Sequence, residues 1–156
     1  GPQERHFTGT WSITGNRQTL DMGPDHRAEI FRLGGSLMLA GDSRPGLAFR
    51  SDIIGLRDNQ SGMQARSVWT DERGDQVFSE LRGGAGGPGH PIEGRFVGGT
   101  GRYAGVSGQY TFKWRALVES EDGSVSGRVV DLEGWARIDA PAETPPSSQG
   151  AIGARP

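Results

Sequence analysis

The sequence contains no cysteine among its 156 residues. It therefore has no disulfide framework, no thiolate metal ligand and no cysteine nucleophile. It also lacks any run of about 18 apolar residues, the length that a membrane-spanning helix needs. The 17 Lys and Arg residues nearly balance the 19 Asp and Glu residues. Because no basic stripe stands out, nucleic acid is not expected as a partner.

The size and composition predict one domain with a substantial core. The 27 glycines and nine prolines show no collagen-like period, and they are typical of many strands joined by tight turns. We expect the β-barrel domain at residues 7–139, after an N-terminal extension at 1–6 and before a disordered Pro/Ser-rich tail at 140–156. The opening Gly1-Pro2 resembles the remnant of a cleaved protease site. The compartment therefore stays open: secreted or periplasmic if a leader was removed, and cytoplasmic otherwise.

Residues 96–138 carry the clearest secondary-structure signal. Apolar and polar side chains alternate with period two from 106 to 118 and again from 124 to 138, which predicts two strands. The segment between them ends in Gly123, which is typical of a three-residue hairpin loop with this glycine in the left-handed region. Such a loop sets Tyr110 opposite Gly134, Phe112 opposite Leu132 and Trp114 opposite Val130.

This register defines a core face and an outer face of the hairpin. A slip of one residue would bury Lys113, which otherwise pairs with Asp131 on the outer face, so the register is well specified. Trp135 is left on the outer face, where an exposed apolar side chain suggests an oligomer contact. The predicted core face comprises Val106, Tyr110, Phe112, Trp114, Val130, Leu132, Ala136 and Ile138.

Six further strands precede this hairpin. They are expected at residues 7–20, 28–41, 47–56, 63–70, 76–81 and 91–98, with a glycine-rich loop at 83–90. Eight strands in sequential order predict an all-β fold, a single eight-stranded antiparallel up-and-down β-barrel.

A polar cluster on the third to fifth strands is the main candidate site. A four-residue loop after the third strand and a tight turn at Arg73-Gly74 would bring its members to one face, near one mouth of the barrel. If that face is the lumen, it forms an apolar pocket with converging polar groups. Asp52 and Glu80 are then the candidate catalytic acid or base. The predicted ligand-binding residues are Arg50, Ser67, Trp69, Phe78, Tyr110, Phe112 and Trp114.

The opposite face of the same strands is the alternative core. One residue more or less in a turn exchanges the two faces of the following strand, so both interpretations stay open. The alternative core comprises Leu47, Phe49, Ile53, Val68, Val77 and Leu81.

Two other features are interpreted as structural. The glycines at 98, 99 and 101 lack the following helix that a phosphate-binding loop needs, so they predict a tight turn, with Tyr103 plugging the barrel end. The histidines have no short ligand spacing, and neither a metal nor a cofactor is predicted. They are His6, His26 and His90.

Two stretches carry a family resemblance. G-D-Q-V-F-S-E-L-R-G at residues 74–83 and G-R-F-V-G-G-T-G-R-Y-A-G-V-S-G-Q-Y at 94–110 resemble the matching strands of the allene oxide cyclase-like barrel proteins, which are also similar to plant dirigent proteins. The G-G-T-G-R-Y-A-G signature is the most specific part, and a broader group of bacterial barrel proteins carries it. The resemblance implies a calycin-like barrel that binds a small hydrophobic molecule and assembles as a dimer or trimer.

The resemblance leaves three functions open. The plant cyclases use a carboxylate and an amide on the first strand, whereas the comparable stretch at 8–16 has no acid and only Asn16 as an amide. The first hypothesis is a cyclase or isomerase that folds a flexible substrate in its lumen. The second is a non-catalytic, dirigent-like or lipocalin-like protein that binds a small hydrophobic or amphipathic molecule. The third is a secreted structural or stress protein whose barrel is filled by its own side chains.

Overall fold

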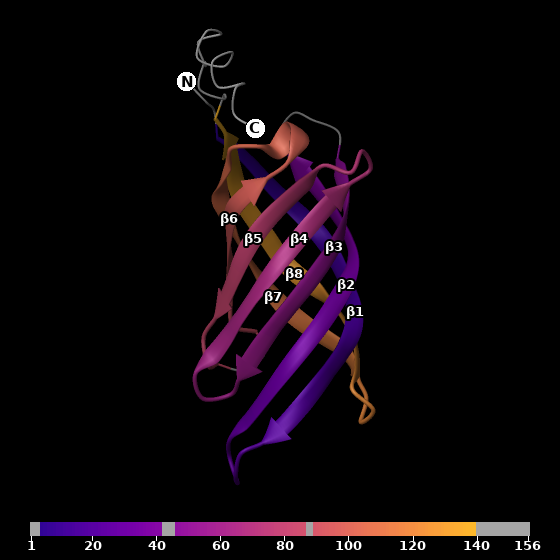
Figure 1. The fold of residues 1–156 in the computed structure, drawn as a ribbon, viewed down its shortest axis with the longest axis vertical. Helices are drawn as coiled ribbons and strands as arrows, with labels where there is room; N and C mark the ends of the chain where they lie inside the picture. Colours follow the sequence, from indigo (N-terminus) through magenta and orange to yellow (C-terminus); the bar gives the residue numbers. More distant parts are fainter. Residues whose placement is uncertain (1–3, 42–45, 87–88, 140–156) are drawn as a thin grey trace, which may run out of the picture.

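The protein forms a closed antiparallel barrel in which each strand pairs with its neighbours in the sequence (Figure 1). The computed structural model describes residues 4–41, 46–86 and 89–139. The all-β, eight-stranded up-and-down prediction is confirmed. The predicted tail at 140–156 lies outside the described residues. The elements are β1 (Arg5–Asp21), β2 (Arg27–Gly41), β3 (Leu47–Asp58), β4 (Gly62–Asp71), β5 (Gln76–Gly83), β6 (Ile92–Gly99), the 3-10 turn η1 (Gly101–Tyr103), β7 (Val106–Glu119) and β8 (Ser124–Ile138).

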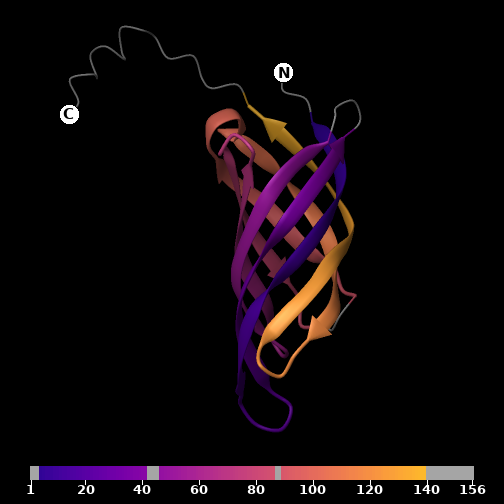
Figure 2. The same cartoon turned by 90° about the vertical axis from the view of Figure 1, so that its right-hand side faces the viewer.

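The two ends of the barrel differ. The upper end carries η1, the start of β1 and the end of β8 (Figure 1). The lower end carries the β1–β2, β3–β4, β5–β6 and β7–β8 connections, and the β1–β2 hairpin projects furthest beyond the barrel (Figure 2). That hairpin is long because β1 and β2 pair without interruption from Phe7 opposite Gly41 to Asp21 opposite Arg27.

The β7–β8 hairpin keeps only part of its predicted register. Gly123 has a φ of 97°, as the loop prediction requires, and Tyr110 lies opposite Gly134. A β-bulge at Asp131, with a φ of 54°, then sets Trp114 opposite Val129 instead of Val130. Val129 is therefore buried and the prediction for Val130 is wrong, because a regular alternation in the sequence does not reveal an inserted residue.

The two faces of this hairpin otherwise follow the prediction, with one exception. Lys113 Nζ still lies 3.9 Å from Asp131 Oδ2 on the outer face. Ile138 was placed in the core, but it is 44% exposed at the upper end. Trp135 is half-buried, and its role in an oligomer stays a prediction.

The faces of β3 and β5 are opposite to those required by the polar-cluster hypothesis. Asp58 pairs with Gly62, so the loop between β3 and β4 has three residues instead of four. Trp69 pairs with Val77 instead of Phe78, so β5 is also displaced by one residue. The alternative core is confirmed for Leu47, Phe49, Ile53, Val77 and Leu81, whereas Val68 lies on the outer face.

Aromatic rings fill the upper and middle lumen. Trp69 lies at the centre, with its ring centroid 5.0 Å from that of Tyr110 and 5.7 Å from those of Trp11 and Phe49. The position of Tyr110 requires glycine at 94, because a Cβ there would overlap the tyrosine ring. These rings therefore pack against one another across the interior of the barrel.

Candidate functional site

The lower lumen contains a cavity of about 120 Å³. Every strand of the barrel contributes to its wall, and the packed aromatic core closes its inner end. The wall is mostly apolar, and its apolar side chains are Ile13, Phe31, Leu33, Ile53, Met63, Leu81, Ile92, Phe112, Trp114 and Val125. An apolar chamber that opens toward polar groups at one end is the usual form of a small-molecule site.

The mouth of this cavity carries charged side chains on three neighbouring strands. Glu29 of β2 lies directly opposite Arg57 of β3 in the strand ladder. Arg17 of β1 approaches the same carboxylate, with 3.9 Å between its Nη1 and Glu29 Oε2. The side chains of Arg17 and Glu29 are only 20% and 19% exposed, so both are largely withdrawn from water.

Two of these groups have unused hydrogen-bonding capacity. The Arg17 Nε atom is buried and has no hydrogen-bond partner among the described residues. Arg57 is half-buried, and its side chain makes no hydrogen bond or ion pair with any part of the chain that the structure describes. The mouth therefore presents donors without matching acceptors.

The β5–β6 connection forms another part of the rim. Gly83, Gly84, Gly86 and Gly89 line it with His90 and Pro91. At Gly83 an added Cβ would meet only ordinary contacts, the nearest being Ile92 Cγ1 at 3.5 Å. At Gly84 and Gly89 an added Cβ would meet no atom within 4 Å, whereas at Gly86 it would overlap the His90 ring.

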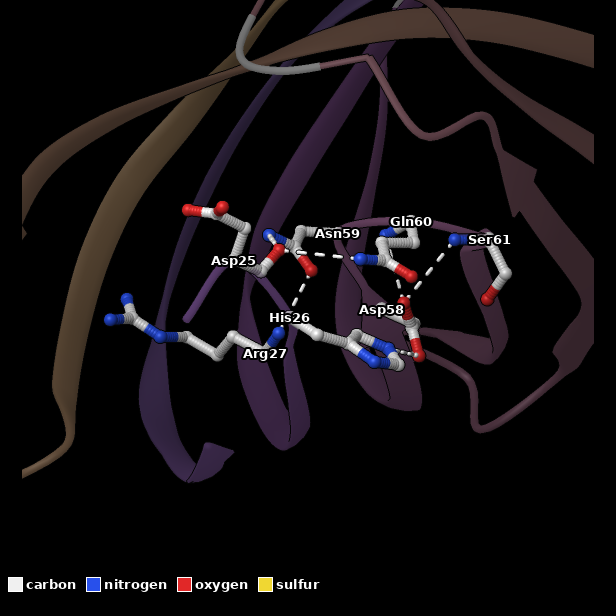
Figure 3. A network of polar contacts seen from close by, with 7 residues as sticks. All are labelled: Asp25, His26, Arg27, Asp58, Asn59, Gln60 and Ser61. Carbon is white, nitrogen blue, oxygen red and sulfur yellow. Dashed lines mark hydrogen bonds and ion pairs between the residues drawn. The ribbon is translucent and has the colours of Figure 1, made fainter. Parts of the chain in front are cut away.

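A polar network ties the β1–β2 turn to the β3–β4 turn beside the mouth (Figure 3). His26 Nε2 lies 2.8 Å from Asp58 Oδ2, and Asp58 Oδ1 accepts hydrogen bonds from the backbone N–H groups of Gln60 and Ser61. The hydrogen bond with His26 lowers the pKa of the Asp58 carboxyl, and the bond from Gln60 lowers it further. These contacts hold the two turns together.

Asn59 completes the network from the β3–β4 side. Its Oδ1 accepts from the backbone N–H of Arg27 at 2.9 Å, and its Nδ2 donates to the backbone carbonyl of Asp25 at 3.2 Å (Figure 3). The carboxylate of Asp25 points away from these contacts.

We expect Asp58→Asn to loosen both turns, because it removes the charge that holds His26 and weakens two backbone contacts. Amide hydrogen exchange should become faster at residues 21–27 and 58–62 while the barrel core stays protected. Asp25→Asn is the matched control, since its carboxylate lies outside the network. Equal exchange in the two variants would contradict a role for Asp58 in fixing the turns.

The glycine signature closes the opposite end of the barrel. Tyr103 is buried in the core, and its hydroxyl donates to Asp71 Oδ2 at 2.9 Å. Arg102 Nε donates to the same oxygen at 3.0 Å, while Asp71 Oδ1 accepts from the backbone N–H groups of Arg73 and Asp75. The prediction that Tyr103 plugs the barrel end is confirmed.

These contacts perturb the titration of both buried groups. Burial would raise the pKa of Asp71, but the hydrogen bonds from Tyr103, Arg73 and Arg102 outweigh it and hold this pKa below its ordinary value. Burial and the neighbouring Asp71 raise the pKa of Tyr103 to about 12. Asp71 is thus an ionised carboxylate whose acceptors are engaged in structural bonds.

The predicted site residues divide between the two faces of the barrel wall. Glu80 lies on the outer face, with Oε1 2.6 Å from Arg95 Nη2. Asp52 also lies outside, 3.8 Å from Arg50 Nε. The premise that Arg50, Asp52, Phe78 and Glu80 face the lumen is wrong, because β3 and β5 are displaced by one residue.

The other predicted residues do lie inside, at two depths. Ser67, Trp69 and Tyr110 are buried in the packed core, whereas Phe112 and Trp114 line the cavity. Arg17, Glu29 and Arg57 were not among the residues predicted from the sequence. The alternation Trp11, Ile13, Gly15 continues to Arg17, and Leu33, Phe31 continues to Glu29, so extending the apolar faces toward the strand ends would have found two of them.

No family model matches the chain, and no curated protein matches it. Among solved structures, the chain is similar to pyocyanin demethylase, with 17% identity and a TM-score of 0.40, over 78% of this chain and 99% of that chain. A likeness at this level carries no argument about the site. Within the described ranges, no helix is long and apolar enough to cross a membrane. The same ranges contain no group of three or more His, Asp or Glu side chains placed to hold a metal ion.

Proposed function

We propose that the protein is an allene oxide cyclase-like barrel that binds one small hydrophobic or amphipathic molecule in the cavity of its lower lumen. The observation that carries this proposal is the apolar chamber itself, which lies between the packed aromatic core and a charged mouth. In a barrel filled entirely by its own side chains, this space would be occupied.

The size of the cavity limits the ligand. An engineered apolar cavity of about 150 Å³ binds benzene in another protein. A chamber of about 120 Å³ therefore suits a single ring or a short chain, with any polar group left at the mouth. A longer molecule would have to extend out between the lower turns.

Binding without catalysis is the better supported of the hypotheses. Two acids line the cavity, Glu29 and Glu119, and two arginines line it with them, Arg17 and Arg57. Among the described residues, Asp71 is the one buried carboxyl, and it is engaged at the opposite end of the barrel. A cyclase or isomerase would need one of the cavity acids to reach the reacting atoms of its substrate.

The test is a substitution that fills the cavity. Gly83→Leu places a branched side chain in the chamber from a position with ordinary contacts and unstrained backbone, so the fold should be retained. We expect wild type to bind benzyl alcohol measurably by isothermal titration calorimetry and the variant to lose at least about tenfold in affinity, because the ring no longer fits.

Gly98→Leu is the matched control. An added Cβ there also meets only an ordinary contact, with Phe78 Cδ2 at 3.6 Å, and Gly98 does not line the cavity. Its affinity for benzyl alcohol should equal that of wild type. Undetectable binding to wild type, or equal binding to Gly83→Leu, would refute the proposed function.

A further inference from the structure

We propose that the ligand is an anion, a small aromatic or short-chain carboxylate whose apolar part fills the lower cavity and whose carboxylate binds Arg17 and Arg57 at the mouth. This inference rests on the proposed function and adds the chemical class of the ligand.

Positive charge exceeds negative charge among the cavity-lining residues of β1, β2 and β3. Two guanidinium groups accompany a single carboxylate there, since Glu29 lies opposite Arg57 in the ladder and 3.9 Å from Arg17. Glu29 compensates one of the two positive charges. The remaining positive charge belongs to a residue that lines the cavity.

The two arginines also supply hydrogen-bond donors that the described residues do not satisfy. The buried Nε of Arg17 and the whole guanidinium of Arg57 lack acceptors among the described residues. A guanidinium presents a planar fork of five N–H donors, and a carboxylate offers two acceptor oxygens with matching geometry. A carboxylate at the mouth would therefore satisfy donors that the protein itself leaves unpaired.

The other charges near the mouth do not favour a cation. A cationic group would have to approach Glu29 against the repulsion of both Arg17 and Arg57. Glu119 lies on β7, two strands away from Arg17, and is exposed to water. Because solvent screens its charge, Glu119 repels an anion bound at Arg57 only weakly.

The apolar wall of the cavity determines which apolar group of the ligand fits. Phe31, Phe112 and Trp114 contribute three aromatic side chains to the chamber. A planar ring of about benzene size fits the cavity volume and stacks readily on such side chains. Benzoate is accordingly the simplest probe that combines both features.

The test compares three probes that share one ring: benzoate, benzyl alcohol and benzylamine. Isothermal titration calorimetry at pH 7 and low salt should show benzoate binding about tenfold more tightly than benzyl alcohol, as expected for a charge-assisted contact, with benzylamine weakest. Arg57→Gln should remove the advantage of benzoate over benzyl alcohol, because the guanidinium that distinguishes the two probes is gone.

Arg50→Gln controls for the loss of one positive charge. Arg50 lies on the outer face with its side chain 71% exposed, so its removal should leave all three affinities unchanged. Equal affinity for benzoate and benzyl alcohol, tightest binding of benzylamine, or an equal effect of Arg50→Gln and Arg57→Gln would each overturn the anion assignment while leaving the proposed function intact. Failure of all three probes to bind wild type would overturn both.

Discussion

Asp71→Asn should destabilise the barrel by about 3 kcal/mol, because it removes the charge from a buried carboxylate that partners Tyr103 and Arg102. The side chain of Asp71 is 1% exposed, so water cannot replace the lost contacts. Urea denaturation should show a lower midpoint with an unchanged slope. Glu72→Gln removes the same charge from an exposed neighbour and should change stability by less than about 0.5 kcal/mol.

The same carboxylate should make stability depend on pH in acid. The pKa of Asp71 is lower in the folded state than its ordinary value of 3.8. Its contribution is therefore complete above that ordinary pKa and is lost as the pH falls through the folded-state pKa. Asp71→Asn should show a smaller loss of stability than wild type between pH 5 and pH 2. An identical acid dependence in the two proteins would contradict the structural role assigned to this group.

Trp69→Ala should be as damaging, with an expected loss of about 4 kcal/mol, because it leaves a cavity at the centre of the aromatic core. The Trp69 ring contacts those of Trp11, Phe49, Phe96 and Tyr110. Thermal and urea denaturation both measure this change. A loss below about 1 kcal/mol would show that the rings do not form one packed unit.

Substitution by phenylalanine separates packing from hydrogen bonding in this core. Trp69 Nε1 has no hydrogen-bond partner within the described part of the chain, so Trp69→Phe should lose packing alone. Trp11 Nε1 donates to Ser51 Oγ at 2.7 Å, so Trp11→Phe also breaks a buried hydrogen bond and should cost about 1 kcal/mol more. Equal costs would contradict the contribution assigned to this bond.

The strand content and order of the barrel could be predicted because the signal is repeated along the chain. Alternation in β7 and β8 marks the strands, and glycine-containing turns separate them. The faces of β3 and β5 could not be predicted with the same certainty. The length of a turn decides which side chains of the strand beside it face the lumen. A difference of one residue turns those side chains toward the solvent instead. The bulge at Asp131 has no distinct sequence signal, since an acidic residue at positive φ looks like any surface residue.

The site was harder to predict than the fold for a related reason. Asp52 and Glu80 look like acids within apolar strands, but an alternating strand presents polar residues to water just as regularly. The glycine signature correctly predicts a turn, but Asp71, which binds Arg102 there, lies about 30 positions away and has no motif of its own. Arg57 can be placed opposite Glu29 only when β2 and β3 are paired correctly.

The most direct test of the ligand site is a crystal structure of the protein grown with benzoate. The aromatic ring should lie in the lower chamber against Phe112 and Trp114, with a carboxylate oxygen within hydrogen-bond distance of the Arg57 guanidinium. Benzoate bound only on the outer wall, or a chamber that closes on itself and admits no ring, would contradict the account.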